Sequence, residues 1–232
     1  MNNNNNENFN KLLLKKGANN KLLREYKMKL NNLSLELWEI SIGLILGDAS
    51  LQTQNKGKTY RLKFEWGDKN KLYAEHIHTI FNEWILSPPH KKIRVNVNGN
   101  TIISWGFQTF SHSAFNPLKD LFLINKYKGI ANNLIHNHLT PRGLAYWWMD
   151  DGGKLDYNKN SKNQGLVLNT HSFTKEEVEM MSNELALKFN LNTCVRLNKN
   201  KHIIVIKHDS YKTFINLTNL YIIPSMRYKL PN

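Results

Sequence analysis

The sequence has a single cysteine, Cys194, which excludes an intramolecular disulfide and any metal site built from several cysteines. No apolar run approaches the roughly 20 residues that span a membrane, and the amino terminus is an asparagine tract with no sign of a signal peptide. Acidic residues are also scarce: 18 Asp and Glu against 32 Lys and Arg give a formal charge of +14. Because a compact protein of that charge repels itself, a polyanionic partner is favoured, nucleic acid ahead of an anionic membrane.

Two apolar segments, each with a carboxylate near its end, are the most informative feature of the chain. The first covers 41–49 and contains Asp48, and the second covers 144–152 and contains Asp151. Each is expected to form a buried helix whose last turn delivers one acid to a shared site. Either segment alone would be interpreted as core with a polar helix end, but the pair on so basic a chain favours an active site.

The remaining periodicity predicts one order of elements twice: helix, strand, strand, helix, hairpin, helix. Ser34 and Thr140 are expected to cap the two motif helices, and Thr174 with Glu177 forms a capping-box pattern. An asparagine-rich stretch to about residue 20 precedes a short helix over 21–31. The first half is expected to have a polar turn over 52–58, a strand over 60–66, a helix over 72–86, hairpin strands over 92–97 and 101–109, a helix over 114–123 and a link over 125–137. The second half is expected to have a poorly marked first strand, then a strand over 166–171, a helix over 174–190, hairpin strands over 194–198 and 202–208, and a helix over 211–222.

The spacing of equivalent residues indicates a divergent duplication. Gly99, in the first hairpin turn, follows Asp48 at nearly the interval that separates Asn200 from Asp151. A duplicated chain predicts a monomer with internal pseudo-two-fold symmetry, which suits the approximate two-fold symmetry of a nucleic-acid duplex. The expected division is an extension with a short helix over 1–33, a first repeat over 34–130 and a second repeat over 131–232.

Small residues in the first motif bear on how the acids meet. Gly43 and Gly47 should let the two motif helices approach closely, which would hold Asp48 beside Asp151. Adjacent carboxylates repel unless a cation lies between them, and a hard divalent ion such as Mg²⁺ suits ligands that are all oxygen. Such a site hydrolyses phosphodiesters, because the metal activates water and stabilises the departing oxygen.

Asp150 competes with Asp151 for this role. Its counterpart in the first motif is Gly47, so a function shared by both motifs is assigned to Asp151. Asp150 is then either a residue that tunes the site through a hydrogen bond or an ordinary acid at a helix end.

Basic residues supply the other candidates. Lys128 and Lys229 are equivalent in the repeat and could offset negative charge on a phosphate, with Lys126 as an alternative to the first. The outward residues of the strands form a candidate DNA surface, because a two-stranded ribbon fits the major groove, where Arg and Lys read guanine and Asn reads adenine. The candidate DNA-contacting residues are Arg61, Lys63, His90, Lys92, Arg94, Asn96, Asn158, Arg196, Asn198 and Lys199.

The two motifs resemble those of the LAGLIDADG homing endonucleases, in the monomeric form that carries both motifs in one chain. The similar runs are 43–49, 87–92, 144–147, 149–154 and 228–232, and the resemblance covers nearly everything after about residue 20. Tyr146 departs from the generic motif, where a small residue is usual. The resemblance implies an α+β fold of two αββαββα repeats that form a saddle of antiparallel sheets over DNA.

The same resemblance implies a function. It predicts a double-strand cut at a long asymmetric DNA site, with short 3′ overhangs, promoting intron mobility in a mitochondrion. The implied cofactor is Mg²⁺, with Mn²⁺ or Ca²⁺ able to substitute in binding. An RNA maturase that assists intron splicing, or a catalytically inactive DNA-binding protein, are the alternatives; the intact acids argue against the second. The implied catalytic residues are Asp48, Asp151, Lys128 and Lys229, and the implied metal site consists of Asp48, Asp151, Gly47 and Asp150.

Overall fold

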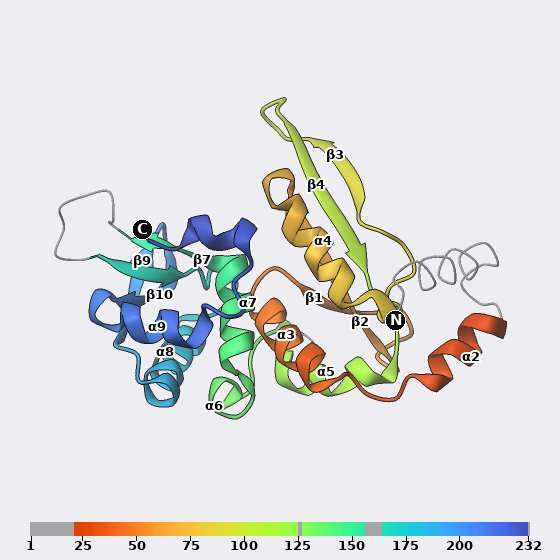
Figure 1. The fold of residues 1–232 in the computed structure, drawn as a ribbon, viewed down its shortest axis with the longest axis horizontal. Helices are drawn as coiled ribbons and strands as arrows, with labels where there is room; N and C mark the ends of the chain where they lie inside the picture. Colours follow the sequence, from red (N-terminus) through yellow and green to blue (C-terminus); the bar gives the residue numbers. More distant parts are fainter. Residues whose placement is uncertain (1–20, 125–126, 156–163, 232) are drawn as a thin grey trace. The chain divides into compact units, whose positions relative to one another are not determined.

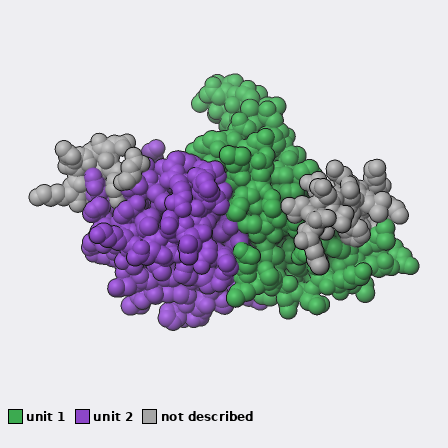
Figure 2. All heavy atoms as spheres, in the orientation of Figure 1, with its two compact units in different colours: residues 1–37, 49–117 green, residues 38–48, 118–232 purple. Residues whose placement is uncertain are grey.

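The computed structural model describes residues 21–124, 127–155 and 164–231, which form two compact units (Figures 1 and 2). Unit 1 comprises the described residues up to 37 together with 49–117. Unit 2 comprises 38–48 together with the described residues from 118 onward. The first motif helix therefore packs with the second repeat, so the units divide the chain differently from the sequence repeats. The asparagine-rich start and the candidates Lys126 and Asn158 lie outside the described residues.

Unit 1 is built on a four-stranded antiparallel sheet in the order β1-β2-β4-β3. The strands are β1 (Ser50–Thr53), β2 (Tyr60–Gly67), β3 (His90–Val95) and β4 (Thr101–Gln108), and the helices are α2 (Lys21–Lys29), α4 (Lys71–Ile80) and the start of α5 (Asn116–Phe122). In β2 buried residues alternate with half-exposed ones, and the buried face packs against α4. Trp66 and Tyr73 stack edge to face with ring centroids 5.1 Å apart, and Phe64 lies against Phe81. Aromatic burial thus fixes α4 on one face of the sheet (Figure 1), and the half-exposed residues of β2 lie on the opposite face.

Unit 2 contains a second sheet with the equivalent order, β7-β8-β10-β9. Its strands are β7 (Gly152–Leu155), β8 (Gly165–Leu168), β9 (Thr193–Asn198) and β10 (Lys201–Lys207), with a two-stranded ribbon of β5 (Leu123–Ile124) and β6 (Tyr127–Lys128). Its helices are α3 (Leu35–Leu46, from Trp38 onward), α6 (Leu134–His138), α7 (Pro141–Asp151), α8 (Lys175–Phe189), α9 (Tyr211–Thr218) and the 3-10 helix η5 (Pro224–Lys229). In the described ranges no helix is long and apolar enough to cross a membrane.

The predicted fold class and order of elements are confirmed, because each repeat reads helix, two strands, helix, hairpin, helix. The caps are also confirmed: the Ser34 hydroxyl accepts from the Leu37 N–H at 3.2 Å, and the Thr140 hydroxyl accepts from the Gly143 N–H at 3.2 Å. Both bonds of the Thr174 capping box are present. Local chemistry at helix starts was therefore sufficient to place them.

Several expected bounds were wrong. The first residues of the turn expected over 52–58 belong to β1, which pairs with β2. The helix over 72–86 ends at Ile80, because the chain turns so that Ile85 forms a bridge with Thr109. The helices over 114–123 and 211–222 are likewise shorter, as α5 and α9. The link over 125–137 contains β6 and α6, which are too short to show a period in the sequence.

Candidate active site

Helices α3 and α7, which carry the two motifs, meet at glycine residues in unit 2. A Cβ built on Gly43 would overlap the carbonyl oxygen of Gly143, and one on Gly143 would lie 2.9 Å from the carbonyl oxygen of Glu39. The helix backbones touch there because neither glycine has a side chain. The predicted close approach is confirmed. Gly143, which was not singled out from the sequence, could have been noticed as an isolated glycine inside a helix.

An ion pair holds the same two helices beside the crossing. The Arg142 guanidinium lies 2.6 Å from the Glu39 carboxylate, and both side chains are largely buried. Arg142 also stacks over the ring of Tyr221, 5.1 Å from its centroid. No signal in one sequence pairs residues so far apart in the chain, and this contact was missed.

The acids lie at the carboxyl ends of the crossing helices. Asp151 is the last residue of α7, whereas Asp48 is exposed two residues beyond the end of α3, not in its last turn as expected. The backbone N–H of Asp48 donates to the Asp150 carboxylate at 3.1 Å. A Cβ on Gly47 would lie 2.5 Å from that of Asp150, so the glycine makes room for this acid. Asp150 thus tethers the first motif to the second.

The pKa of Asp151 is raised by its surroundings. Burial, with the nearby charge of Asp48 as the next cause, raises the pKa of Asp151 to about 7. The charges of Lys128 and Lys229 act in the opposite direction but do not outweigh those causes. A carboxyl group with so raised a pKa is typical of a functional site.

The two predicted lysines contact equivalent backbone atoms. The Lys128 ammonium donates to the carbonyl of Gly47 at 3.4 Å, and the Lys229 ammonium donates to the carbonyls of Asp150 and Met149, each at 2.6 Å. Gly47 and Asp150 each directly precede a motif acid. The two lysines, which are equivalent by spacing in the sequence, therefore also make equivalent contacts. Both lie at the ends of the motif helices.

Lys128 is further positioned by the amino-terminal end of α8. Its ammonium lies 5.1 Å from the centroid of the Phe173 ring. The Glu177 carboxylate accepts from the N–H of Ile130 at 3.1 Å, two residues after Lys128, and from the N–H of Thr174 at 2.8 Å. Burial lowers the pKa of Lys128, offset in part by the charges of the three motif acids. Glu177 was predicted only as a capping residue, and its bond to Ile130 has no signature in the sequence.

The raised pKa of Asp151 predicts how stability depends on pH. Between the ordinary value of 3.8 and about 7 the folded protein binds a proton that the unfolded chain has released. The contribution of this group to stability is therefore complete below pH 3.8 and is lost as pH rises through 7. Urea unfolding in EDTA should show that the unfolding free energy of wild type, relative to that of Asp151→Asn, is higher at pH 5 than at pH 8. A difference that does not change with pH would contradict the assignment.

The donor atoms at this site are all oxygens. They are the carboxylates of Asp48 and Asp151 and the carbonyls of Gly47 and Asp150. The described part of the chain has no group of three or more His, Cys, Asp or Glu side chains able to hold a metal ion. Two carboxylates nevertheless fit Mg²⁺, which takes one or two and fills its shell with water and phosphate oxygens.

The DNA-contact candidates in the strands of unit 1 lie on the sheet face opposite α4, and one acid forms ion pairs with two of them. The Glu65 carboxylate lies 2.6 Å from the Lys92 ammonium and 3.1 Å from the Arg94 guanidinium, and it also accepts from Ser104. Lys63 and His90 line a small pocket together with Lys92. Lys92 and Arg94 are therefore held in place by Glu65, which lies two residues after Lys63 on the same face of β2.

Asn96 differs from its expected position. It lies beyond the end of β3, where its side-chain oxygen accepts from the N–H groups of Asn98 and Asn100 at 3.0 and 2.9 Å. An asparagine reads adenine through both its amide oxygen and its amide nitrogen. Because the oxygen is occupied, Asn96 serves the hairpin turn.

The candidates of unit 2 lie on and beside β9. Arg196 is half-buried and pairs with Ile203 of β10, while Asn198 and Lys199 are exposed at the hairpin end. Lys199 has a φ of 47° and forms the turn with Asn200. The face that Arg196 shares is apolar at its centre, with a cluster of Val167, Ile203 and Val205. This sheet therefore offers fewer cations than the sheet of unit 1.

Comparison with known proteins agrees with the class that this fold and paired-acid site define. The model of the LAGLIDADG DNA endonuclease family matches residues 38–214, and the chain belongs to that family. A solved structure of the homing endonuclease I-WcaI bound to its DNA recognition sequence is similar to this chain, with a TM-score of 0.90 and 48% identity over 96% of this chain and 97% of that one.

Two relatives carry names that bear on function. A Wickerhamomyces canadensis protein named "Probable intron-encoded endonuclease 1" is 50% identical over 218 residues, 94% of each chain. A Debaryomyces hansenii protein named cytochrome b mRNA maturase bI2 is 30% identical over 86% of this chain and 75% of the relative.

Proposed function

We propose that the protein is a homing endonuclease that cuts both strands of a long asymmetric DNA site, leaves short 3′ overhangs and so promotes the mobility of its intron. One observation carries the proposal: Asp48 and Asp151 lie at the ends of crossing helices, each beside a lysine bound to the carbonyl that precedes it. The charge of +14 and the relatives named as intron-encoded and homing endonucleases support a DNA substrate.

The chemistry follows from these residues. Asp48 and Asp151 would hold the divalent cation, Mg²⁺ in the cell, with Mn²⁺ or Ca²⁺ able to replace it in binding. When bound, the ion supplies an activated water and stabilises negative charge on the departing oxygen. Asp151 must be ionised to bind a cation, so cation binding below pH 7 would release its proton. The ammonium charges of Lys128 and Lys229, held at the ends of the motif helices, would offset the negative charge of the phosphate. The Asp150 carboxylate orients the backbone of Asp48.

The direct test is cleavage of DNA that spans the insertion site of the intron. Linear products with short 3′ overhangs should form with Mg²⁺ and should be absent with EDTA. Protein that binds this DNA with Mg²⁺ but never cuts either strand would overturn the proposal. Cutting in EDTA would overturn the metal requirement alone.

Two of the glutamates of α8 provide a test of how Lys128 is positioned. Glu177 and Glu184 each accept two backbone N–H bonds, but those of Glu184 come from Asn133 and His136 of the α6 region. Glu177→Gln should slow cleavage of one strand by about 10-fold or more, because Lys128 moves while Lys229 does not. Nicked intermediate should therefore accumulate in a time course on supercoiled plasmid.

Glu184→Gln is the matched control for that experiment. It loses a comparable, partly buried hydrogen bond, so stability should fall by about 1–3 kcal/mol, but folded molecules should cut both strands at the rate of wild type. Equal nicking by the two variants, measured below their unfolding temperatures, would show that Glu177 acts only through stability.

A second candidate function is RNA maturase activity, in addition to or in place of cutting. The observation that favours it is the similarity to proteins of D. hansenii and Saccharomyces cerevisiae named cytochrome b mRNA maturase bI2. The relatives named as intron-encoded proteins also support an organelle-encoded, mitochondrial protein. The test is the rate at which the host precursor RNA splices. Equal acceleration of splicing by wild type and by Asp48→Asn would establish this activity independently of cleavage.

A further inference from the structure

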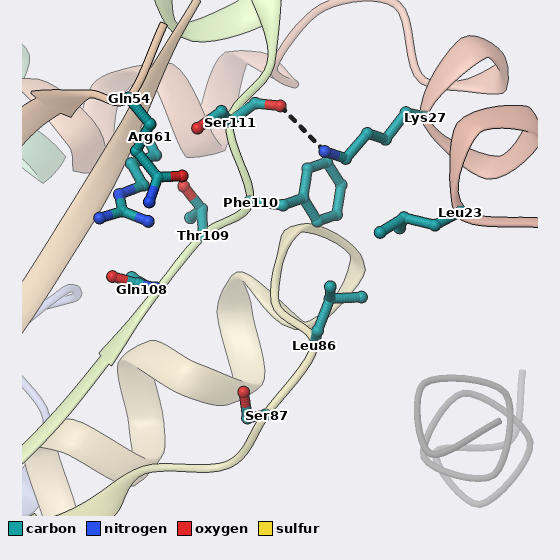
Figure 3. Close-up of a pocket in the computed structure, with 10 residues that line it drawn as sticks. All are labelled: Leu23, Lys27, Gln54, Arg61, Leu86, Ser87, Gln108, Thr109, Phe110 and Ser111. Carbon is teal, nitrogen blue, oxygen red and sulfur yellow. Dashed lines mark hydrogen bonds between the residues drawn. The ribbon is translucent and has the colours of Figure 1, made fainter. Parts of the chain in front are cut away.

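Unit 1 contains a pocket of about 330 Å³ where α2 meets the sheet (Figure 3). Its lining comes from α2, from β2 and its neighbouring turn, from Leu86 and Ser87 between α4 and β3, and from the end of β4 with the segment that follows. The charged residues among those that line it are Lys27 and Arg61, and none of its lining residues is acidic. The pocket therefore carries two positive charges with no carboxylate to neutralise them.

The ammonium of Lys27 is held at the edge of this pocket. It donates to the carbonyl of Ser111 at 3.3 Å and lies 4.8 Å from the centroid of the Phe110 ring, as Figure 3 shows. Burial lowers its pKa, so part of its hydration is already lost. A lysine ammonium has three donors, and this geometry leaves donors for an acceptor in the pocket.

Two further polar atoms of the pocket lack partners. The Nε of Arg61 and the hydroxyl of Ser111 are buried and make no hydrogen bond within the described residues. One terminal nitrogen of Arg61 donates to the side chain of Gln52 at 3.3 Å. Unsatisfied buried donors are costly and uncommon, and a bound acceptor accounts for them. Ammonium, guanidinium and hydroxyl donors together suit an anionic group that only accepts, which describes a phosphodiester.

The neighbouring pocket on the same sheet provides a contrast. It is lined by Lys63, His90 and Lys92, but the Lys92 ammonium is paired with Glu65 at 2.6 Å. Charge on one of its cations is thereby cancelled within the protein. Among the residues that line these two pockets, Arg61 and Ser111 are the ones with a buried polar side-chain atom that has no hydrogen-bond partner within the described residues.

We propose that the pocket formed by Lys27, Arg61 and Ser111 binds a phosphodiester group of the DNA backbone and so anchors α2 on the duplex. The inference rests on the proposed function for the presence of DNA, and it adds a site that is independent of the motif acids. Contacts to phosphate fix the register of a protein on DNA but carry no direct sequence information. The amino-terminal extension thus acquires a role in positioning the substrate.

The test is the salt dependence of DNA binding by Lys27→Gln, with Lys29→Gln as the control. Lys29 lies on the same helix but is exposed and does not line the pocket. Because each neutralised phosphate contributes about 0.9 to the slope of log K against log salt, Lys27→Gln should reduce that slope by about one. Lys29→Gln should change it by clearly less, and Lys27→Arg should restore it. Thermal unfolding of each variant establishes that α2 remains folded.

A modified duplex locates the contact. A methylphosphonate is placed at one backbone position of the duplex at a time. At one of these positions it should weaken DNA binding by wild type but leave DNA binding by Lys27→Gln unchanged. Unchanged slope and affinity in Lys27→Gln, or a change of base preference in place of the slope, would overturn the inference. The inference would also be overturned if the protein–DNA complex still bound inorganic phosphate saturably, because the pocket would then be unoccupied by the duplex. If the slope of log K against log salt changes as expected but neither wild type nor any variant cuts DNA, the proposed phosphodiester contact is supported and the proposed nuclease function fails.

Discussion

Replacing Asp151 or Asp48 with asparagine is expected to reduce double-strand cleavage by about 1,000-fold or more while DNA affinity changes little. Loss of a metal-binding carboxylate removes several kcal/mol of transition-state stabilisation, and each 1.36 kcal/mol corresponds to a factor of about ten. Binding persists because the cationic candidates of the unit 1 sheet are untouched. Single-turnover cleavage on the target duplex, with binding measured in Ca²⁺, separates the two effects.

Asp150→Asn is the control for this prediction. An asparagine oxygen can still accept the hydrogen bond from the Asp48 N–H, so the tether between the motifs survives. Cleavage should fall by less than about tenfold, because the group that repeats in both motifs is intact. An inactive Asp150→Asn beside an active Asp151→Asn would reverse the assignment of the two neighbouring acids.

Stability provides the check that the inactive variant is folded. The ionised Asp151 side chain is unfavourable in the metal-free protein, since its pKa is raised to about 7. Asp151→Asn removes that cost, so above pH 7 its unfolding temperature in EDTA should equal or exceed that of wild type. A variant that had lost activity through misfolding would unfold at a lower temperature.

The second large effect is expected from Gly43→Val. A Cβ at this position would overlap the carbonyl oxygen of Gly143 and lie 3.0 Å from the backbone nitrogen of Trp147. Backbone atoms of a facing helix cannot move aside as a flexible side chain can, so α3 and α7 must separate. Unit 2 should lose about 3 kcal/mol of stability or more, and cleavage should disappear with it.

Gly67→Ala provides the matched glycine substitution. Gly67 has a φ of −62°, and a Cβ there would meet nothing within 4 Å. Alanine is therefore expected to leave the unfolding free energy within about 0.5 kcal/mol of wild type. Urea unfolding of both variants makes the comparison, and a Gly43→Val variant as stable as Gly67→Ala would contradict the backbone contact.

Much of the fold could be predicted because its signals are local. Ser34, Thr140 and Thr174 mark helix starts through hydrogen bonds to residues three positions away, and the structure has all three. The hairpin turns at Gly99 and Asn200 are marked by residues that adopt positive φ. Strand β2 shows its alternation over residues 60–66, where aromatic or aliphatic side chains alternate with charged ones. For these elements the sequence within one window contains the cause.

The site could be predicted only in part, because most of what shapes it is non-local. The acids and lysines were found through the repeat, which is a property of sequence alone. The bond from Asp48 to Asp150, the pair of Glu39 with Arg142 and the bond from Ile130 to Glu177 each join residues in different elements. No pattern within a helix or strand encodes such partners. They depend on which faces the folded chain brings together.

The placement of the first motif helix in unit 2 has a consequence for retargeting. Residues 38–48 and 118 onward include both motif acids, both lysines, the glycine crossing and the Glu177 bond. A chimera that takes residues 49–117 from a relative would exchange the sheet carrying Arg61, Lys63, Lys92 and Arg94 and would keep that whole set native. The useful junctions for recombination therefore flank 49–117, and a junction at the border between the sequence repeats would separate α3 from the helix it crosses.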